Sequence, residues 1–128
     1  MQYYFSKLLE TGLQDAVQRV TDALKKEGFG ILTDIDVSDT LRKKIGADFP
    51  AYRILGACNP RLAHEALQLE SKIGTMLPCN VVVRDGGGGK VEVAAIDPVA
   101  SMAAIDNPRL KQAAEQVREK LQRVVASL

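Results

Sequence analysis

Apolar and polar positions alternate along the chain in short runs that predict strands separated by helices. Residues 2–10 are aromatic and apolar enough to form a strand. Residues 31–37 place Ile, Thr, Ile and Val at every second position, which is the period of a strand with one wet face. Further β-rich runs occupy residues 51–58, 79–84 and 90–96. A polar glycine loop joins the last two runs, so they are predicted to form an antiparallel hairpin.

The first helix has the clearest pattern of the chain. Thr11 followed by Gln14 is a capping-box pattern, which predicts the start of the helix. Gly28 has the position of a left-handed residue that ends it, with Leu24 and Phe29 placed for the apolar contact of a Schellman motif. Between these ends, one face of the helix carries the apolar residues Leu13, Ala16, Val17, Val20 and Leu24.

Three further helices are predicted from their end signals. A short helix carries Leu41 and Ile45, is capped by Ser38 or Asp39 and is ended by Gly46. Asn-Pro pairs at residues 59–60 and 107–108 open the other two, since Asn caps well and Pro suits the first turn. The apolar faces of these two helices are Leu62, Ala63, Ala66, Leu67 and Leu69, and then Leu110, Ala113, Ala114, Val117, Leu121, Val124 and Val125.

This order of elements predicts an α+β fold in which an antiparallel sheet is covered by helices on one face. The chain has no internal repeat, linker or charge block, so residues 1–128 are expected to form one domain. A chain of 128 residues needs neither a disulfide nor a metal to stabilise its core.

Charge and composition narrow the classes of partner. The chain has 17 basic and 16 acidic residues, a net charge of +1 and few aromatic residues, so no nucleic acid is expected to bind. Residues 1–7 do not have the pattern of a signal peptide, and no apolar stretch approaches the roughly 20 residues that span a bilayer. With only two cysteines, the chain is expected to be cytoplasmic, reduced and not bound to a membrane.

Four short stretches resemble a known family. They are residues 27–30 (Glu-Gly-Phe-Gly), 52–60 (Tyr-Arg-Ile-Leu-Gly-Ala-Cys-Asn-Pro), 77–83 (Leu-Pro-Cys-Asn-Val-Val-Val) and 106–108 (Asp-Asn-Pro). In this order and spacing they are similar to domain-of-unknown-function family 302 (DUF302). The resemblance implies a fold like that of the TATA-box-binding protein, with five strands in the order β-α-β(4)-α and residues 59–78 as a helical insertion. It also implies a homodimer and a link to sulfur metabolism, but no established activity.

Two cysteines give the chain its one candidate site. Cys58 ends a predicted strand directly before the Asn59 cap, where helix N–H groups favour negative charge and hence the reactive thiolate. Cys79 opens the next strand, so antiparallel pairing would bring both thiols to the same end of the sheet. His64 follows one turn into the helix, and Met76 precedes Cys79. Together these residues are candidates for a thiolate with a base, or for a soft-metal site.

Each of these candidates has a plainer structural explanation. Free cysteine often packs as a small hydrophobic residue, and a lone histidine is more often a surface or capping residue. Residues 86–90 (Gly-Gly-Gly-Gly-Lys) lack the following Ser or Thr and the helix of a phosphate loop, so they are interpreted as a hairpin turn. Asp34 and Asp36, and the basic run at residues 42–44, are interpreted as solvated faces.

Three functions remain open, in order of preference. The first is a small homodimeric domain that binds a small ligand, a sulfur species or a soft metal near Cys58, Asn59, His64 and Cys79. The second is a protein-interaction module without chemistry, and the third is a thiol-dependent sulfur-transfer enzyme. The sequence places no acid or base convincingly beside a nucleophile, and it identifies no cofactor or metal.

Overall fold

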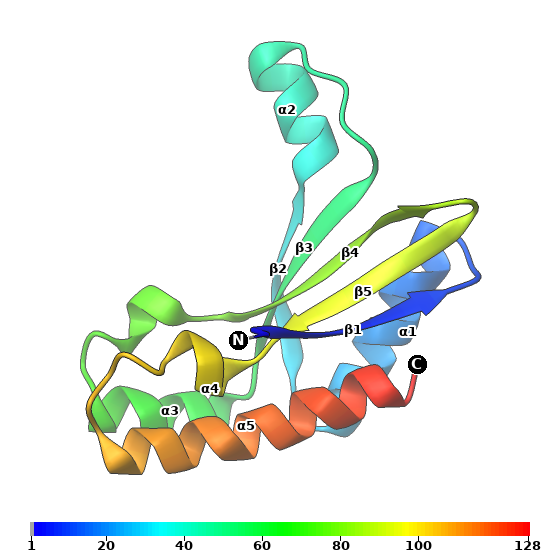
Figure 1. The fold of residues 1–128 in the computed structure, drawn as a ribbon. Coiled ribbons are helices and arrows are strands. Elements are labelled where there is room, and N and C mark those ends of the chain that lie inside the picture. The colour runs from blue at the N-terminus through cyan, green and yellow to red at the C-terminus, as the bar shows by residue number, and fades with distance from the viewer. Residues whose placement is uncertain (1) are drawn as a thin grey trace.

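Five strands form one antiparallel sheet in the computed structural model, which describes residues 2–128 (Figure 1). The strands pair in the order β1-β5-β4-β3-β2, and every neighbouring pair is antiparallel. The predicted α+β class and the glycine hairpin are therefore confirmed. The strands are β1 (Tyr4–Leu9), β2 (Gly30–Asp36), β3 (Tyr52–Cys58), β4 (Cys79–Gly87) and β5 (Lys90–Ile96).

Two long helices cover one face of this sheet. They are α1 (Leu13–Lys26) and α5 (Pro108–Ala126), which contact each other as well as the strands (Figure 1). Between them and the sheet lies the main hydrophobic core, because every second residue of the central strands points toward the helices. The core includes Leu24, Phe29, Leu55, Ala57, Cys79, Val81, Val83, Val93, Leu121 and Val124.

The predicted end of α1 is confirmed, but its predicted start is wrong. Gly28 has a φ of 86°, and the Phe29 N–H donates to the Leu24 carbonyl at 2.9 Å, as a Schellman motif requires. At the other end, Gly12 is the N-cap and no side chain caps the helix. The Thr11 hydroxyl donates instead to the Asp15 carboxylate at 2.6 Å, so the capping box does not form.

Strand β2 contains a bulge that the alternating pattern does not predict. Ile31 pairs with Ala57 on the helix-covered face, but Thr33 pairs with Gly56 on the open face. Leu32 is the extra residue between them and is 67% exposed. Ile31 and Thr33 were expected to share one face of the sheet. The inserted residue reverses the face on which each later side chain of β2 lies.

Helix α2 (Val37–Ile45) stands away from the rest of the molecule on an arm formed by the ends of β2 and β3 (Figure 1). Its N-cap is Asp36, whose carboxylate accepts from the Asp39 N–H at 3.0 Å, so the prediction of Ser38 or Asp39 was wrong. Gly46 ends the helix with a φ of 65°, as predicted. None of its residues is buried, and its main contact is with β3.

A second, smaller hydrophobic cluster lies beyond the end of the sheet. The first turns of α5 extend past the strands and pack against helix α3 (Pro60–Leu69), the 3-10 turn η1 (Ile73–Met76) and the short helix α4 (Pro98–Ser101). Neither η1 nor α4 was predicted from the sequence. The buried members of this cluster are Ala66, Ile73, Met102, Leu110 and Ala114.

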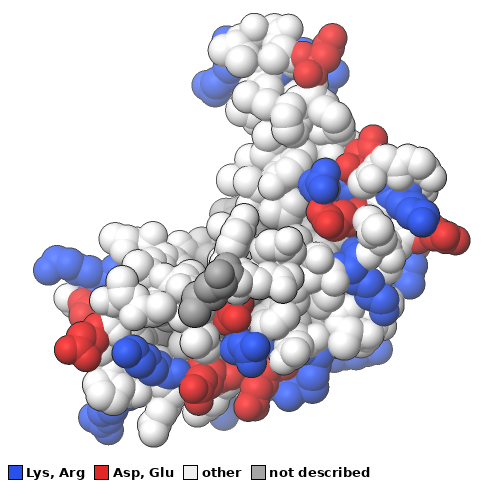
Figure 2. Space-filling view, viewed as in Figure 1, with Lys and Arg blue, Asp and Glu red and all other residues white. Residues whose placement is uncertain are grey.

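The other face of the sheet has no helix over it. Figure 2 shows that side chains in the angle between the α2 arm and the α3–α4 end are mainly uncharged. Charged side chains gather instead along α5, at the β4–β5 hairpin and at the tip of the arm. Within residues 2–128, no helix is both long enough and apolar enough to cross a membrane.

Candidate functional site

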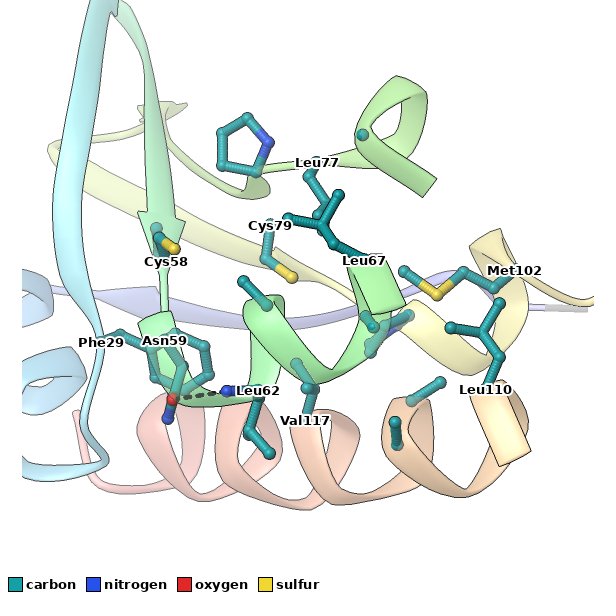
Figure 3. A pocket seen from close by; sticks show the side chains of 18 of the residues that line it. Phe29, Cys58, Asn59, Leu62, Leu67, Leu77, Cys79, Met102, Leu110 and Val117 are labelled. Atoms are coloured by element: carbon teal, nitrogen blue, oxygen red, sulfur yellow. Dashed lines mark hydrogen bonds between the residues drawn. The ribbon is translucent and has the colours of Figure 1, made fainter. Parts of the chain in front are cut away.

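A pocket of about 310 Å³ lies where the main core meets the smaller cluster (Figure 3). Phe29, Ala57 and Cys79 line it from the main core, and residues of α3, α4 and α5 line it from the other side. The wall contains no charged side chain and no hydroxyl. Its residues are Phe29, Leu32, Ala57, Cys58, Asn59, Leu62, Ala63, Ala66, Leu67, Gly74, Leu77, Pro78, Cys79, Pro98, Met102, Leu110, Ala113, Ala114 and Val117.

Antiparallel pairing of β3 with β4 brings both cysteines to this wall. Cys58 is the last residue of β3, and Cys79 is the first residue of β4 and pairs with Ala57. Strict alternation would point Ala57 and Cys58 to opposite faces, but the chain leaves the sheet at Cys58, and both residues line the pocket. The prediction that the thiols lie at the same end of the sheet is confirmed.

The two thiols differ in their surroundings. Cys79 is only 8% exposed and belongs to the main core, whereas Cys58 is half-buried. Burial raises the pKa of the Cys79 thiol to about 11, with a smaller contribution from the nearby Cys58. Cys79 is therefore protonated at neutral pH, which makes it a poor nucleophile.

Asn59 lines the pocket, but both ends of its side-chain amide are already engaged. The carbonyl oxygen Oδ1 accepts from the Leu62 N–H at 3.3 Å and so caps α3, as predicted. The nitrogen Nδ2 donates to the Glu27 carbonyl at 3.4 Å, at the end of α1. The dashed line in Figure 3 marks the capping bond. Asn59 therefore holds the rim of the pocket in place, with one hydrogen bond made at each end of its amide.

His64 and Met76 do not join the cysteines at the pocket. His64 is exposed on α3 and is not among the residues of the wall. Met76 lines a neighbouring hollow of about 270 Å³, which lies against Leu77, Pro78 and Cys79. Across residues 2–128, no three His, Cys, Asp or Glu side chains are grouped so that they could hold a metal ion.

The remaining polar candidates have structural partners. Arg53 donates two hydrogen bonds to the Asp34 carboxylate, the one from Nε at 2.8 Å, and these bonds lower the pKa of Asp34. Asp36 caps α2, and Asp39 forms ion pairs with Arg42 and Lys43 at 3.0 and 2.9 Å. These contacts give structural roles to the acidic pair Asp34 and Asp36 and to Arg42 and Lys43 of the basic run, and no catalytic role is needed to explain them.

Most of the pocket wall was not predicted as a site. Leu62, Ala63 and Leu67 were assigned to the apolar face of α3, yet only Ala66 on that helix is buried. Leu67 is 45% exposed although it lines the pocket. The apolar residues of α3 were visible in the sequence, but nothing in their pattern separates the wall of a pocket from a packed core.

The fold and the pocket together define a small α+β domain with an apolar, ligand-sized cavity at one end of its sheet. The chain belongs to the family described as domain of unknown function DUF302, whose family model matches residues 5–128. A crystal structure of an uncharacterized conserved DUF302 protein from Bacillus stearothermophilus has the same fold, with a TM-score of 0.91 and 28% sequence identity. The match covers 98% of each chain. A search of curated proteins found no match.

Proposed function

We propose that the chain acts as a single cytoplasmic domain that binds a small apolar molecule in the pocket between β3, α3 and α5. The observation that supports this proposal is a cavity of about 310 Å³ whose side chains are almost all apolar. Ligand sites are commonly concave and mostly apolar, with a few polar groups that fix orientation. Here the polar groups are the thiols of Cys58 and Cys79 and the engaged amide of Asn59.

The size and chemistry of the wall limit the ligand. An apolar cavity of about 150 Å³ holds a benzene molecule, so this pocket accommodates a bicyclic aromatic or a medium-length alkyl chain. A charged group inside the pocket would find no partner and would lose its hydration, which is costly. Any polar end of the ligand therefore projects from the mouth, where the exposed side chains of Leu32 and Leu67 lie.

A titration with naphthalene and n-octanol, followed by the amide shifts of ¹⁵N-labelled protein, tests the proposal. We expect saturable shifts at Leu67 and Val117, which lie in the wall. Ala114→Leu fills part of the cavity and should abolish them, whereas Ala103→Leu makes the same change at an exposed position outside the wall. Shifts that do not saturate, or that persist in the Ala114→Leu protein, would contradict the proposal.

Native mass spectrometry of protein purified without reductant or chelator tests for a natural ligand. Excess mass that is lost on denaturation would support a bound small molecule or metal. Added sulfur that survives denaturation and maps to Cys58 or Cys79 would favour sulfur transfer instead. The raised pKa of Cys79, about 11, argues against that residue as the carrier, since little thiolate exists at neutral pH.

We also propose that two copies of the chain associate. The observation in favour is the unpacked apolar surface: Ile35 and Leu8 on the open face of the sheet and Ile45 on α2 are all exposed. A nine-residue helix is marginally stable without packing, so α2 gains stability from a partner surface. The apolar side of α5 is already buried within the chain, and the exposed apolar side chains favour the open sheet face as the contact.

A further inference from the structure

Apart from the Asn59 amide, whose oxygen and nitrogen each already take part in one hydrogen bond, the wall of the pocket offers a ligand two polar side-chain groups. Asn59 uses its oxygen for the Leu62 N–H and its nitrogen for the Glu27 carbonyl. The other side chains of the wall are aliphatic, aromatic or, at Met102, a thioether. The thiols of Cys58 and Cys79 are what remains to fix an apolar ligand in place.

The positions of the two thiols give them different roles. Cys58 lies at the strand end where the chain turns into α3, and it is half-buried, so a molecule entering the pocket can reach its sulfur. Cys79 is buried in the main core. Figure 3 shows both sulfurs on the same side of α3, with Cys79 lying between Cys58 and Met102.

We propose that Cys58 captures one half of an apolar disulfide as a mixed disulfide, with the captured apolar group seated in the pocket and Cys79 left as a free thiol. This inference rests on the proposed function of the pocket and names the class of its ligand: an apolar disulfide, R–S–S–R′. It also names the sulfur of Cys58 as the atom to which the ligand becomes attached, whereas non-covalent binding in the pocket requires no such attachment.

The exchange step needs no further oxidant. The Cys58 thiol loses its proton, and its thiolate attacks one sulfur of the ligand disulfide. The new Cys58 S–S–R bond forms as the S–S bond of the ligand breaks, and R′–S⁻ leaves and takes up the proton. One disulfide is consumed and one is formed, so the capture is reversed when an external thiolate attacks the mixed disulfide.

Cys79 determines how long the captured group stays. In many dithiol sites, the second thiolate displaces the group and closes an internal disulfide. Burial keeps the Cys79 thiol protonated at neutral pH, with a pKa of about 11, so this displacement is slow. The mixed disulfide therefore persists until another thiol reaches Cys58 from the mouth of the pocket.

Two aromatic disulfides of opposite polarity test the inference. The neutral 2,2′-dipyridyl disulfide fits an apolar pocket, whereas the dianionic 5,5′-dithiobis(2-nitrobenzoate) does not, and each releases a coloured thiol. The rate of reaction with the neutral reagent is divided by the rate with the dianionic reagent. This ratio is measured on the folded Cys79→Ala protein, which retains Cys58, and on the same protein unfolded in urea. We expect the ratio to be at least about tenfold higher in the folded protein, because only the folded pocket excludes charge.

Two controls connect the ratio to the pocket. Ala114→Leu should bring the ratio down to that of the unfolded chain, and Ala103→Leu should leave it high. In the Cys58→Ala protein, Cys79 should react far more slowly when folded than when unfolded. Should Cys79→Ala not fold, peptide mapping of the labelled, unsubstituted chain gives the same assignment of the modified cysteine.

A folded ratio no higher than the unfolded one, or modification of Cys79 as fast as that of Cys58, would overturn the inference. The proposed function has a separate readout. If one of those two results occurs but the Cys58→Ala protein still binds naphthalene, the pocket remains a binding site and only covalent capture is excluded. If naphthalene does not bind that protein or the unsubstituted chain, the proposed function itself is wrong.

Discussion

The side-chain amide of Asn59 donates a hydrogen bond to the backbone carbonyl of Glu27, across 32 positions of sequence. This bond joins the end of α1 to the start of α3, while the Asn59 oxygen caps α3 itself. Asn107 repeats the arrangement: it caps α5 and donates to the Leu69 carbonyl at 3.1 Å, at the end of α3. Two asparagines thus link the helices α1, α3 and α5.

Asn59→Ala should destabilise the protein by about 1–2 kcal/mol, because the cap of α3 is lost. Asn59→Asp keeps the capping oxygen but cannot donate to the Glu27 carbonyl, so it should cost less. Urea denaturation of the three proteins measures both effects. A stability of the Asn59→Ala protein equal to that of the unsubstituted chain would show that neither bond contributes.

Gly56 lies where two side chains approach the sheet closely from its open face. A Cβ atom built on Gly56 would lie 2.2 Å from the Thr33 hydroxyl oxygen and 2.7 Å from Cγ of Pro78. Gly56→Ala should therefore destabilise the protein by about 1–3 kcal/mol, as overpacking does. Thermal unfolding measures the change.

Gly30→Ala is the matched control, since a Cβ atom on Gly30 in the neighbouring strand would meet nothing within 4 Å. Its effect should stay within about 0.5 kcal/mol. The double variant Thr33→Ala, Gly56→Ala removes the shorter contact and should recover part of the loss. Equal effects at Gly30 and Gly56 would mean that the close approach is not what excludes a side chain.

Local signals were enough to predict most of the elements. Gly28 and Asn59 each act through atoms a few residues away, and both formed the predicted helix end and cap. The antiparallel pairing of the last two strands followed from the glycine hairpin, because a short loop leaves two strands no other way to pair. The placement of Cys58 and Cys79 at one end of the sheet was conditional on antiparallel pairing of their two strands, which the helical insertion between them does not impose and which the structure supplies.

Features that depend on distant contacts were not predictable from local pattern. The bulge at Leu32 arises from the pairing of β2 with β3 and has no signature in the alternation itself. The cap of α2 moved to Asp36 because β2 continues directly into the helix. The pocket depends on how far α5 extends past the sheet and on how α3 packs against α5. Neither of these can be predicted from the pattern of any single segment.

The buried Cys79 thiol should make stability fall at high pH. Its pKa is about 11 in the folded protein, compared with an ordinary value of 9.0, so both states are almost fully protonated at neutral pH. As the pH rises from there toward 11, the unfolded chain loses the proton and the folded protein keeps it, so the free energy of unfolding decreases. The loss should total about 2–3 kcal/mol, since one pH unit corresponds to at most 1.36 kcal/mol.

Urea denaturation in reductant, between about pH 8 and pH 11, measures this slope in the unsubstituted chain and in Cys79→Ala. All other titratable groups are the same in both proteins, so the difference between the two slopes isolates Cys79. We expect the stability advantage of the unsubstituted chain to shrink as pH rises. Parallel curves would mean that the thiol is not desolvated in the folded protein.

The last prediction concerns association through the open sheet face. Sedimentation at micromolar concentration should give the mass of a dimer, and Ile35→Lys should weaken association by at least about tenfold, because a charge would be buried without a partner. Leu67→Lys is the matched control: its side chain is 45% exposed, compared with 47% for Ile35, but it lies on α3 away from that face. A monomeric mass for the unsubstituted chain would contradict the homodimer. A dimer that Leu67→Lys disrupts and Ile35→Lys leaves intact would move the contact to the α3 end, where the mouth of the pocket lies.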